Sequence, residues 1–115
     1  MERDKLFILK TPFKDTAYPG QDFYCWNCIL MEGLLKMFPK LEARMDVERI
    51  DFLRPRESVI EHVGEENQSL PTLVLADNAP KGIETGEYKN TRFVKGKDAI
   101  MQALNARHGI PIPHP

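Results

Sequence analysis

Short runs of apolar residues, separated by polar and turn-forming stretches, are the clearest pattern along this chain. Residues 6–9 (Leu-Phe-Ile-Leu) and 73–75 (Leu-Val-Leu) are unbroken apolar runs, which are typical of strands covered on both faces of a sheet. Residues 47–52 alternate between polar and apolar side chains, which indicates an edge strand with one partly solvated face. After a stretch rich in turn-forming residues, from 77 to 90, residues 91–94 are predicted to form a fourth short strand.

Apolar residues at helical spacing predict a first helix after the first strand and a long loop. The loop covers residues 11–24 and is interrupted by proline and glycine. The apolar stripe of the helix consists of Leu30, Leu34, Met37, Phe38 and Leu41. We expect Pro39 to end or kink this helix near Phe38, because proline has no N–H and its ring crowds the carbonyl of Leu35.

Two further helices are predicted from their boundary residues and their apolar faces. Pro55 is expected to open the second helix, where its missing N–H costs little, and Gly64 lies near the end of that helix. Asp98 is expected to cap the start of the last helix, and Gly109 to end it. The apolar faces of these helices carry Val59, Ile60 and Val63, and Ile100, Ala103 and Leu104 respectively.

The predicted order of elements is therefore β-α-β-α-β-β-α. This order predicts an α/β fold with a central four-stranded mixed sheet flanked by helices. The first β-α-β unit is expected to be parallel and right-handed. The 115 residues are expected to form a single domain. Residues 110–115 contain three prolines and are expected to form an extended tail, docked through Ile110 and Ile112.

The composition is that of a globular protein without a strong net charge. Apolar residues make up 42% of the chain and charged residues 29%, which excludes a disordered chain. The 16 basic and 17 acidic residues give a formal charge of -1, so binding to nucleic acid or to an anionic membrane is not expected. The apolar run at residues 6–9 ends at Lys10 and is too short for a signal peptide or a membrane span. We therefore expect a cytosolic protein, in which thiols are mostly reduced.

The two cysteines carry the most specific chemical information. They can form neither a scaffold of several disulfides nor a four-cysteine zinc site. Cys25-Trp26-Asn27-Cys28 is a CxxC motif at the predicted start of the first helix, where unpaired N–H groups and the helix dipole stabilise a thiolate. Cys25 is predicted to be an exposed nucleophile. Cys28, one turn deeper, is predicted to resolve the mixed disulfide that Cys25 forms.

A proline lies just before the third predicted strand, in Ser69-Leu70-Pro71-Thr72. Proline at the start of a buried strand is unusual, because it cannot donate a hydrogen bond to the sheet. A cis Leu70–Pro71 bond would resolve this conflict and place the turn beside the CxxC motif.

Two aromatic residues, Tyr24 and Trp26, flank the predicted nucleophile. They are candidates for a hydrophobic lip that contacts a protein substrate. The alternative is that they pack against the loop of residues 11–24, and the sequence favours neither interpretation.

These features together resemble the thioredoxin-like superfamily over most of the chain. The resemblance rests on the CxxC motif, on Leu70-Pro71-Thr72 and on the order of the elements. The chain is more closely similar to an uncharacterised bacterial family of short thioredoxin-like proteins, in residues 18–20, 23–26, 64–71 and 96–100. The superfamily resemblance implies a cis proline at Pro71 and a substrate groove beside it, with Leu70, Pro71 and Thr72 as binding residues. It also implies thiol–disulfide exchange by Cys25 and Cys28.

The chain departs from the known families of this superfamily in two places. Trp26-Asn27 is neither the Gly-Pro pair of thioredoxins nor the Pro-Tyr pair of glutaredoxins, so the direction of the exchange stays open. Glutaredoxins and the N-terminal domains of glutathione transferases bind the glutamyl end of glutathione near the start of the last helix. The matching segment here is Gly96-Lys97-Asp98. The resemblance makes Asp98 a candidate partner for the glutamyl ammonium group, although the transferase-type Glu-Ser pair is missing.

Three hypotheses on function follow. The first is a thiol–disulfide oxidoreductase that acts on a disulfide-bearing protein or a small thiol and needs no organic cofactor. The second is a non-catalytic interaction module that holds a partner protein near Trp26 and Pro71. The third is a role linked to glutathione or to a metal. A zinc site would add two of His62, His108 and His114 to the cysteines, but their spacing fits no compact finger pattern. Without such a site, we expect His62 at the surface and His108 to complement the last helix dipole.

Overall fold

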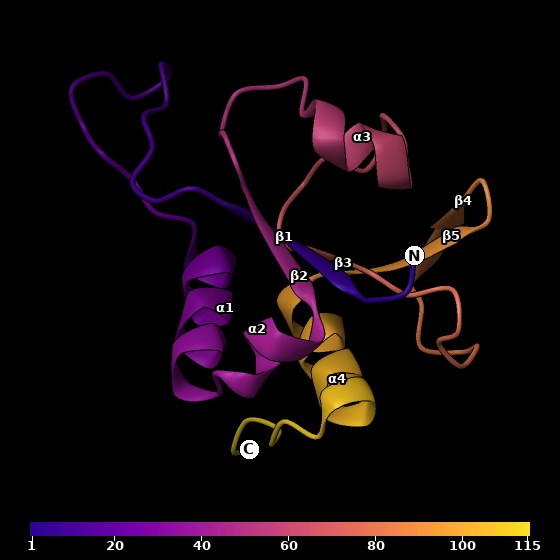
Figure 1. Cartoon of the computed structure of the whole chain (residues 1–115). Helices are drawn as coiled ribbons and strands as arrows, with labels where there is room; N and C mark the ends of the chain where they lie inside the picture. The colour runs from indigo at the N-terminus through magenta and orange to yellow at the C-terminus, as the bar shows by residue number, and fades with distance from the viewer.

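The apolar runs predicted as strands belong to one five-stranded mixed sheet in the computed structural model, which describes residues 1–115 (Figure 1). The strands are β1 (Lys5–Leu9), β2 (Asp46–Ile50), β3 (Thr72–Val74), β4 (Gly86–Tyr88) and β5 (Thr91–Lys95). Their order across the sheet is β2-β1-β3-β5-β4. The pairing of β1 with β2 confirms that the first β-α-β unit is parallel, and all other neighbours are antiparallel.

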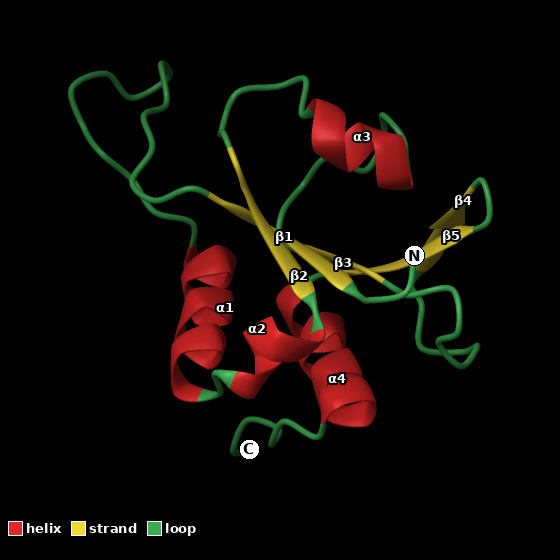
Figure 2. Ribbon diagram, in the orientation of Figure 1, coloured by secondary structure: helices red, strands yellow, loops and turns green.

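Four helices cover the two faces of the sheet, as Figure 2 shows. They are α1 (Trp26–Met37), α2 (Lys40–Arg44), α3 (Glu57–Val63) and α4 (Lys97–His108). Three of them, α1, α2 and α4, lie on one face, and α3 lies alone on the other. None of the four is long and apolar enough to cross a lipid bilayer.

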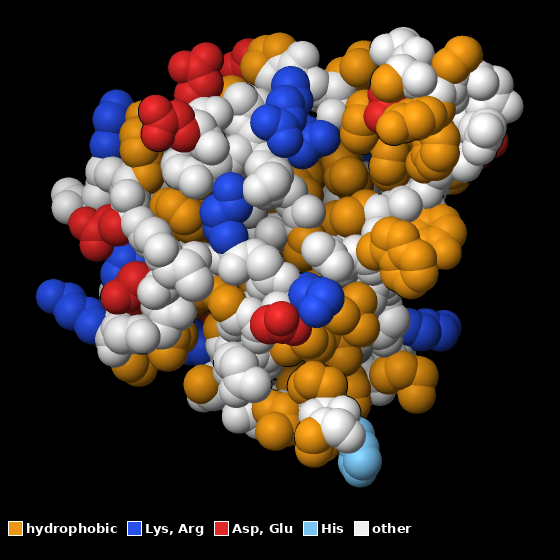
Figure 3. Space-filling model, turned by 180° about the vertical axis from the view of Figure 1, so that it is seen from behind, with side chains coloured by type: hydrophobic (Ala, Val, Ile, Leu, Met, Phe, Trp, Pro, Cys, Tyr) orange, Lys and Arg blue, Asp and Glu red, His pale blue; other side chains and the backbone are white.

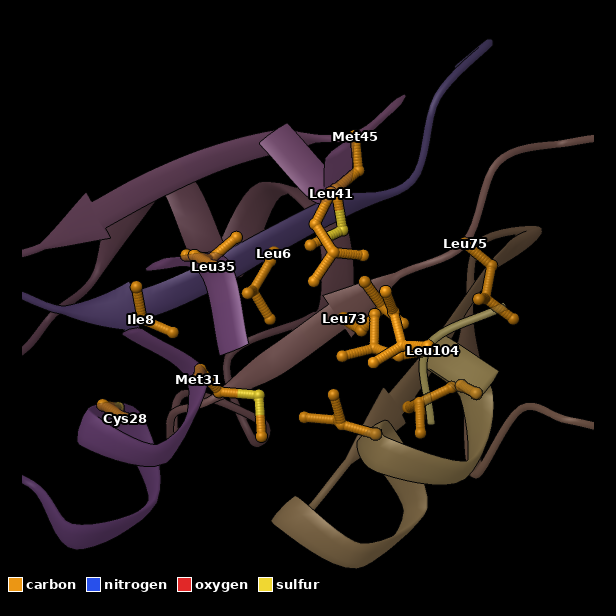
Figure 4. Close-up of a cluster of buried hydrophobic side chains, with 14 of the residues drawn as sticks. Leu6, Ile8, Cys28, Met31, Leu35, Leu41, Met45, Leu73, Leu75 and Leu104 are labelled. Carbon is orange, nitrogen blue, oxygen red and sulfur yellow. The ribbon is translucent and has the colours of Figure 1, made fainter. Parts of the chain in front are cut away.

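The strand β1 separates the two parts of the hydrophobic core. Leu6, Phe7 and Ile8 have no exposed surface, as expected for a strand covered on both faces. Leu6 and Ile8 belong to a cluster of 16 buried residues on the side of α1, α2 and α4 (Figure 4). Phe7 belongs to a smaller cluster that includes Val59 and Val63 of α3. The alternation of side chains along β1 therefore fixes which helices pack on which face.

The predicted number of strands was wrong, because four were expected and five form. The missed strand, β4, lies in the stretch interpreted as turns and is only three residues long. It begins with Gly86, and a Cβ atom there would come within 2.6 Å of the Phe93 ring on β5. The close approach of this ring requires glycine, and glycine removes the side-chain pattern by which a strand is recognised in a sequence.

Proline and glycine set the helix boundaries, partly as predicted. The first helix ends at Met37, before Pro39, as expected, but Pro39 then caps a separate short helix that carries the buried Leu41. The second predicted helix begins at Glu57 with Arg56 as its cap, so the expectation that Pro55 opens it was wrong. Gly64 follows its last residue, as expected.

The two ends of α4 differ in how well the sequence predicted them. Asp98 was expected to be the N-cap, but Gly96, with φ of 88°, takes that place, and Asp98 lies in the first turn. A glycine adopts this positive φ without the steric cost that a side chain brings. At the other end, Gly109 has the left-handed conformation expected of a helix stop. Beyond it, Ile110 is buried but Ile112 is 54% exposed, so the tail docks through Ile110 only.

A buried carboxylate joins the start of the chain to its last helix. The side chain of Asp4 is fully buried and accepts hydrogen bonds from Arg107 (2.9 and 3.2 Å) and from the Ala76 N–H (2.8 Å). The His108 Nε2 atom lies 2.8 Å from the same carboxylate and donates to it, because a carboxylate only accepts. His108 thus lies in the last turn of α4, and it is buried there against Asp4.

We predict that Asp4→Ala lowers the free energy of unfolding by about 3 kcal/mol, because it leaves buried donors without their acceptor. Chemical denaturation measures this change. The matched control is Asp46→Ala, which removes an exposed ion pair with Arg3 and should cost less than about 1 kcal/mol. Equal effects of the two variants would show that the buried network does not stabilise the fold.

A pH dependence follows from the same network. Burial alone would raise the pKa of Asp4, but the hydrogen bonds from His108, Arg107 and the Ala76 N–H together hold it well below its usual range. The folded state therefore binds a proton less readily than the unfolded state, and this stabilisation is lost as the pH falls below about 4. We predict that the unfolding free energy declines less between about pH 6 and about pH 3 in Asp4→Asn than in the unmodified protein. A decline of equal size in both would contradict this assignment.

Candidate functional site

The CxxC motif lies at the start of α1, where the sequence predicted it. Cys25 is the N-cap residue, with an extended backbone (φ -85°, ψ 124°), and its Sγ accepts a hydrogen bond of 3.3 Å from the Cys28 N–H. A sulfur atom thus takes the place that a serine or aspartate oxygen usually has at a helix N-cap. This sulfur thus lies at the positive end of the α1 dipole and satisfies one of the N–H groups that the first turn leaves without a helical partner.

The two thiols differ in their surroundings. Cys25 is half-buried, whereas Cys28 has no exposed surface and lies in the core beside Ile8 and Met31 (Figure 4). The Sγ of Cys28 accepts a hydrogen bond of 3.4 Å from the Leu9 N–H at the end of β1. Burial raises the pKa of the Cys28 thiol to about 12, against the effect of this hydrogen bond. Both cysteines are free thiols, so the motif is in its reduced form.

A buried arginine that the sequence did not mark lies close to the thiols. The Arg56 guanidinium donates to the carbonyl oxygens of Phe52 (2.6 and 3.1 Å) and Gln68 (2.8 Å) and has no carboxylate partner. Burial and the neighbouring Arg54 lower the pKa of Arg56, while the two cysteines act in the opposite direction. Sequence reasoning missed Arg56. It is one of 16 basic residues in the chain, and its position after Pro55 gives no sign that its side chain is buried.

The segment before β3 is connected to the same arginine. The Gln68 side chain accepts a hydrogen bond of 2.8 Å from the Arg56 backbone N–H. Three residues further on, the Leu70–Pro71 bond is cis, as the sequence predicted. Thr72 is buried and its hydroxyl donates to the Ser69 carbonyl (2.8 Å). Leu70 is partly buried and, like Cys25, packs against the larger core cluster.

The remaining candidate residues lie on the surface. Trp26 is 81% exposed and Tyr24 55% exposed, with their rings 6.3 Å apart, so packing against the loop does not cover the tryptophan. Asp98 is exposed and forms an ion pair of 2.9 Å with its neighbour Lys97.

The histidines do not join the cysteines in a metal-binding group. His62 is half-buried, with its ring against that of Phe7 (5.3 Å between centroids), so the expectation of a solvated surface residue was wrong. His108 is bound to Asp4. No three His, Cys, Asp or Glu side chains come together in a group that could hold a metal ion.

We predict that iodoacetamide modifies Cys25 in the folded protein and leaves Cys28 unmodified. Only the thiolate is nucleophilic, so Cys28, with its raised pKa, should react at least about a hundredfold more slowly than in the unfolded chain. Peptide mass spectrometry measures both rates, with protein in denaturant as the control in which Cys28 reacts freely. Rapid modification of Cys28 in the folded protein would contradict its placement in the core.

The comparison with known proteins gives one match. Residues 3–112 match the model of a family described as "Protein of unknown function (DUF3088)". No curated protein and no solved structure matches the chain. Because the family model spans nearly all of the 115 residues, the expectation of an uncharacterised family is confirmed, and the chain belongs to the DUF3088 family.

Proposed function

We propose that this protein is a thiol–disulfide oxidoreductase in which Cys25 attacks and Cys28 resolves. The observation that carries the proposal is the unequal placement of the two thiols on one helical turn. Cys25 is accessible at the N-cap, and Cys28 is buried behind it. Residues three apart on a helix are neighbours, within the span that a disulfide bridges.

The proposal includes a thioredoxin-like fold. Its support is a parallel β1-α1-β2 unit, followed by the antiparallel strands β3 and β5 and the helix α4. Further support comes from the CxxC motif at the start of α1 and from the cis Pro71 just before β3. Exchange chemistry of this kind suits the expected cytosolic compartment, where reduced thiols are maintained.

The first chemical step is an attack by the Cys25 thiolate on one sulfur of a substrate disulfide. A bond forms between Cys25 Sγ and that sulfur, the substrate S–S bond breaks, and the other substrate sulfur leaves as a thiolate. Before the attack, Cys25 Sγ accepts the Cys28 N–H and lies at the positive end of the α1 dipole.

The second step releases the substrate and oxidises the protein. Cys28 gives its proton to the departed thiolate, attacks Cys25 Sγ, and expels the second substrate sulfur as a thiolate. That thiolate takes up a proton from the solvent, in place of the one that Cys25 lost to the solvent when it ionised. The substrate has then gained two electrons and two protons, and Cys25 and Cys28 have become a disulfide. An external dithiol, or two monothiols, returns the pair to its reduced form. The high pKa of Cys28 ensures that it reacts only within the mixed disulfide, where the attack is intramolecular.

Substrate contacts are assigned to the surface around Cys25. Trp26 and Tyr24 present exposed rings beside the nucleophile, and the backbone of Leu70, Pro71 and Thr72 is proposed to hold the substrate chain.

The same exposed rings favour the second candidate function, a non-catalytic module that holds a partner protein. In that case Cys25→Ser/Cys28→Ser would capture the partner as well as the unmodified protein does.

We predict that Cys25→Ser reduces the catalysed reduction of a model peptide disulfide by dithiothreitol to the uncatalysed rate. Cys28→Ala should form a mixed disulfide with the peptide at Cys25, because the resolving thiol is missing. The matched control is Met37→Ala, an exposed apolar position at the far end of α1, which should retain the full rate. Turnover by Cys25→Ser at the rate of the unmodified protein would overturn the mechanism.

A further inference from the structure

The segment of residues 11–24, here named the aromatic arm, projects beyond the edge of the sheet (Figure 1). Phe13 and Phe23 exchange two backbone hydrogen bonds, of 3.0 and 2.8 Å, which close the arm into a hairpin. An ion pair of 2.7 Å between Lys14 and Asp22 joins the same two sides. The arm is thus held by its own contacts, although the sequence predicted only a loop.

The aromatic arm and the segment after β2 line an open cavity of about 220 Å³. Five of its six lining residues are aromatic and the sixth is an acid: the cavity is lined by Phe13, Asp15, Tyr18, Phe23, Tyr24 and Phe52. Figure 3 shows apolar side chains gathered on this side of the molecule, over α1 and the arm. Pockets for small-molecule ligands usually measure about 300 to about 1,000 Å³, so this smaller cavity has room for a single side chain of a partner.

The rings hold one another in place and leave aromatic surface uncovered. The Phe13 ring stacks on that of Phe52, with centroids 4.6 Å apart. The Tyr18 ring meets that of Phe23 at an angle of 67°, with centroids 5.9 Å apart. Tyr18 is nevertheless 62% exposed, and Tyr24 is exposed as well. Because the face of an aromatic ring carries partial negative charge, these rings favour a cation over an anion as the ligand.

One negative charge in the cavity has no positive partner. The arm contains two acids and one cation, and the ion pair with Asp22 occupies that cation, Lys14. The other acid, Asp15, is half-buried and forms no ion pair. One of its carboxylate oxygens accepts the Ala17 N–H (3.0 Å), and the other has no partner in the chain. The cavity therefore combines aromatic rings with a carboxylate that is free to bind a donor.

Arg56 does not supply the missing positive charge. Its guanidinium lies 5.7 Å from the centroid of the Phe52 ring, but Arg56 does not line the cavity. Its N–H groups donate to the carbonyl oxygens of Phe52 and Gln68. The contact with Phe52 is itself an example of the attraction between a guanidinium and an aromatic ring.

A guanidinium group matches both features of the cavity. A neutral or anionic ligand would remove water from the Asp15 carboxylate without replacing its hydrogen bonds, which costs free energy. An arginine side chain instead donates a charge-assisted hydrogen bond to the free carboxylate oxygen, and its planar group stacks on an aromatic ring. Lysine carries the same charge, but its ammonium group lacks the planar surface.

We propose that the cavity of the aromatic arm binds an arginine side chain of a partner polypeptide. The guanidinium binds the Asp15 carboxylate and lies against the exposed rings of Tyr18 and Tyr24. The cavity is open and belongs to a projecting part of the surface, where a polypeptide has access. No cysteine lines the cavity, so this binding does not depend on the exchange reaction proposed above and goes beyond it.

The binding experiment is an NMR titration of the isotope-labelled, unmodified protein, followed at the backbone amide signals of residues 11–24. The ligand is acetyl-Gly-Arg-Gly-amide, and three matched peptides replace arginine by citrulline, lysine or glutamate. Citrulline has the shape of arginine without its charge. We expect saturable shifts with the arginine peptide, at least about threefold weaker binding of the lysine peptide, and at least about tenfold weaker binding of the other two.

Variants of the protein separate the charge from the rings. Asp15→Asn keeps an acceptor for the Ala17 N–H and should weaken binding of the arginine peptide at least about fivefold. The matched control Glu87→Gln removes an exposed acid from β4, at the opposite edge of the sheet from β2, and should bind the peptide unchanged.

Two substitutions of one ring test the aromatic part of the site. Tyr18→Leu keeps an apolar side chain but removes the ring, and should weaken binding at least about threefold. Tyr18→Phe keeps the ring and should bind like the unmodified protein. The amide signals of Phe13 and Phe23 report in each variant that the hairpin stays closed.

Several results would overturn the proposal. They are equal binding of the arginine and citrulline peptides, equal binding of the arginine and lysine peptides, tighter binding of the glutamate peptide, and no binding of any peptide. Dimers detected by light scattering and abolished by Tyr18→Leu would assign the cavity to a second copy of the chain instead. Selective binding of the arginine peptide by a protein that catalyses no disulfide exchange would refute the oxidoreductase function and retain the binding site. Catalysed exchange without arginine binding would do the reverse.

Discussion

The burial of Cys28 against the end of β1 is the constraint from which the arrangement of the site follows. Its sulfur accepts the Leu9 N–H, and its side chain fills the core between the sheet and α1. With this residue fixed, the first turn of α1 is fixed as well, and Cys25 lies half-buried at the helix start. A core contact therefore determines which of the two thiols is buried and which reaches the surface.

The sequence was most informative where a pattern is local. The apolar run of β1, the stop at Pro39 and the CxxC motif at a helix start all depend on residues close together in the chain, and each was predicted correctly. The short helix α2 and the strand β4 were not predicted, because the first follows a proline and the second contains a glycine that admits the Phe93 ring. Local propensity gives no sign of such tertiary contacts.

The surroundings of the thiols could not be predicted for a related reason. The guanidinium of Arg56 is buried because it satisfies the carbonyl oxygens of Phe52 and Gln68, and the second of these is 12 residues away. Likewise, the Phe52 ring stacks on that of Phe13, which belongs to the loop of residues 11–24, with centroids 4.6 Å apart. These groups meet only when the sheet brings the ends of β1 and β2 together, so no window of the sequence contains the site.

The central claim is that Cys25 and Cys28 form a reversible disulfide. The most direct test equilibrates the protein with mixtures of reduced and oxidised dithiothreitol or glutathione. The number of alkylated thiols is then measured by mass spectrometry at each redox potential. The account predicts one two-electron transition, in which both thiols disappear together and the mass falls by that of two hydrogen atoms. Two thiols that remain alkylatable under every oxidising mixture, or a stable adduct on Cys25 beside a free Cys28, would contradict it.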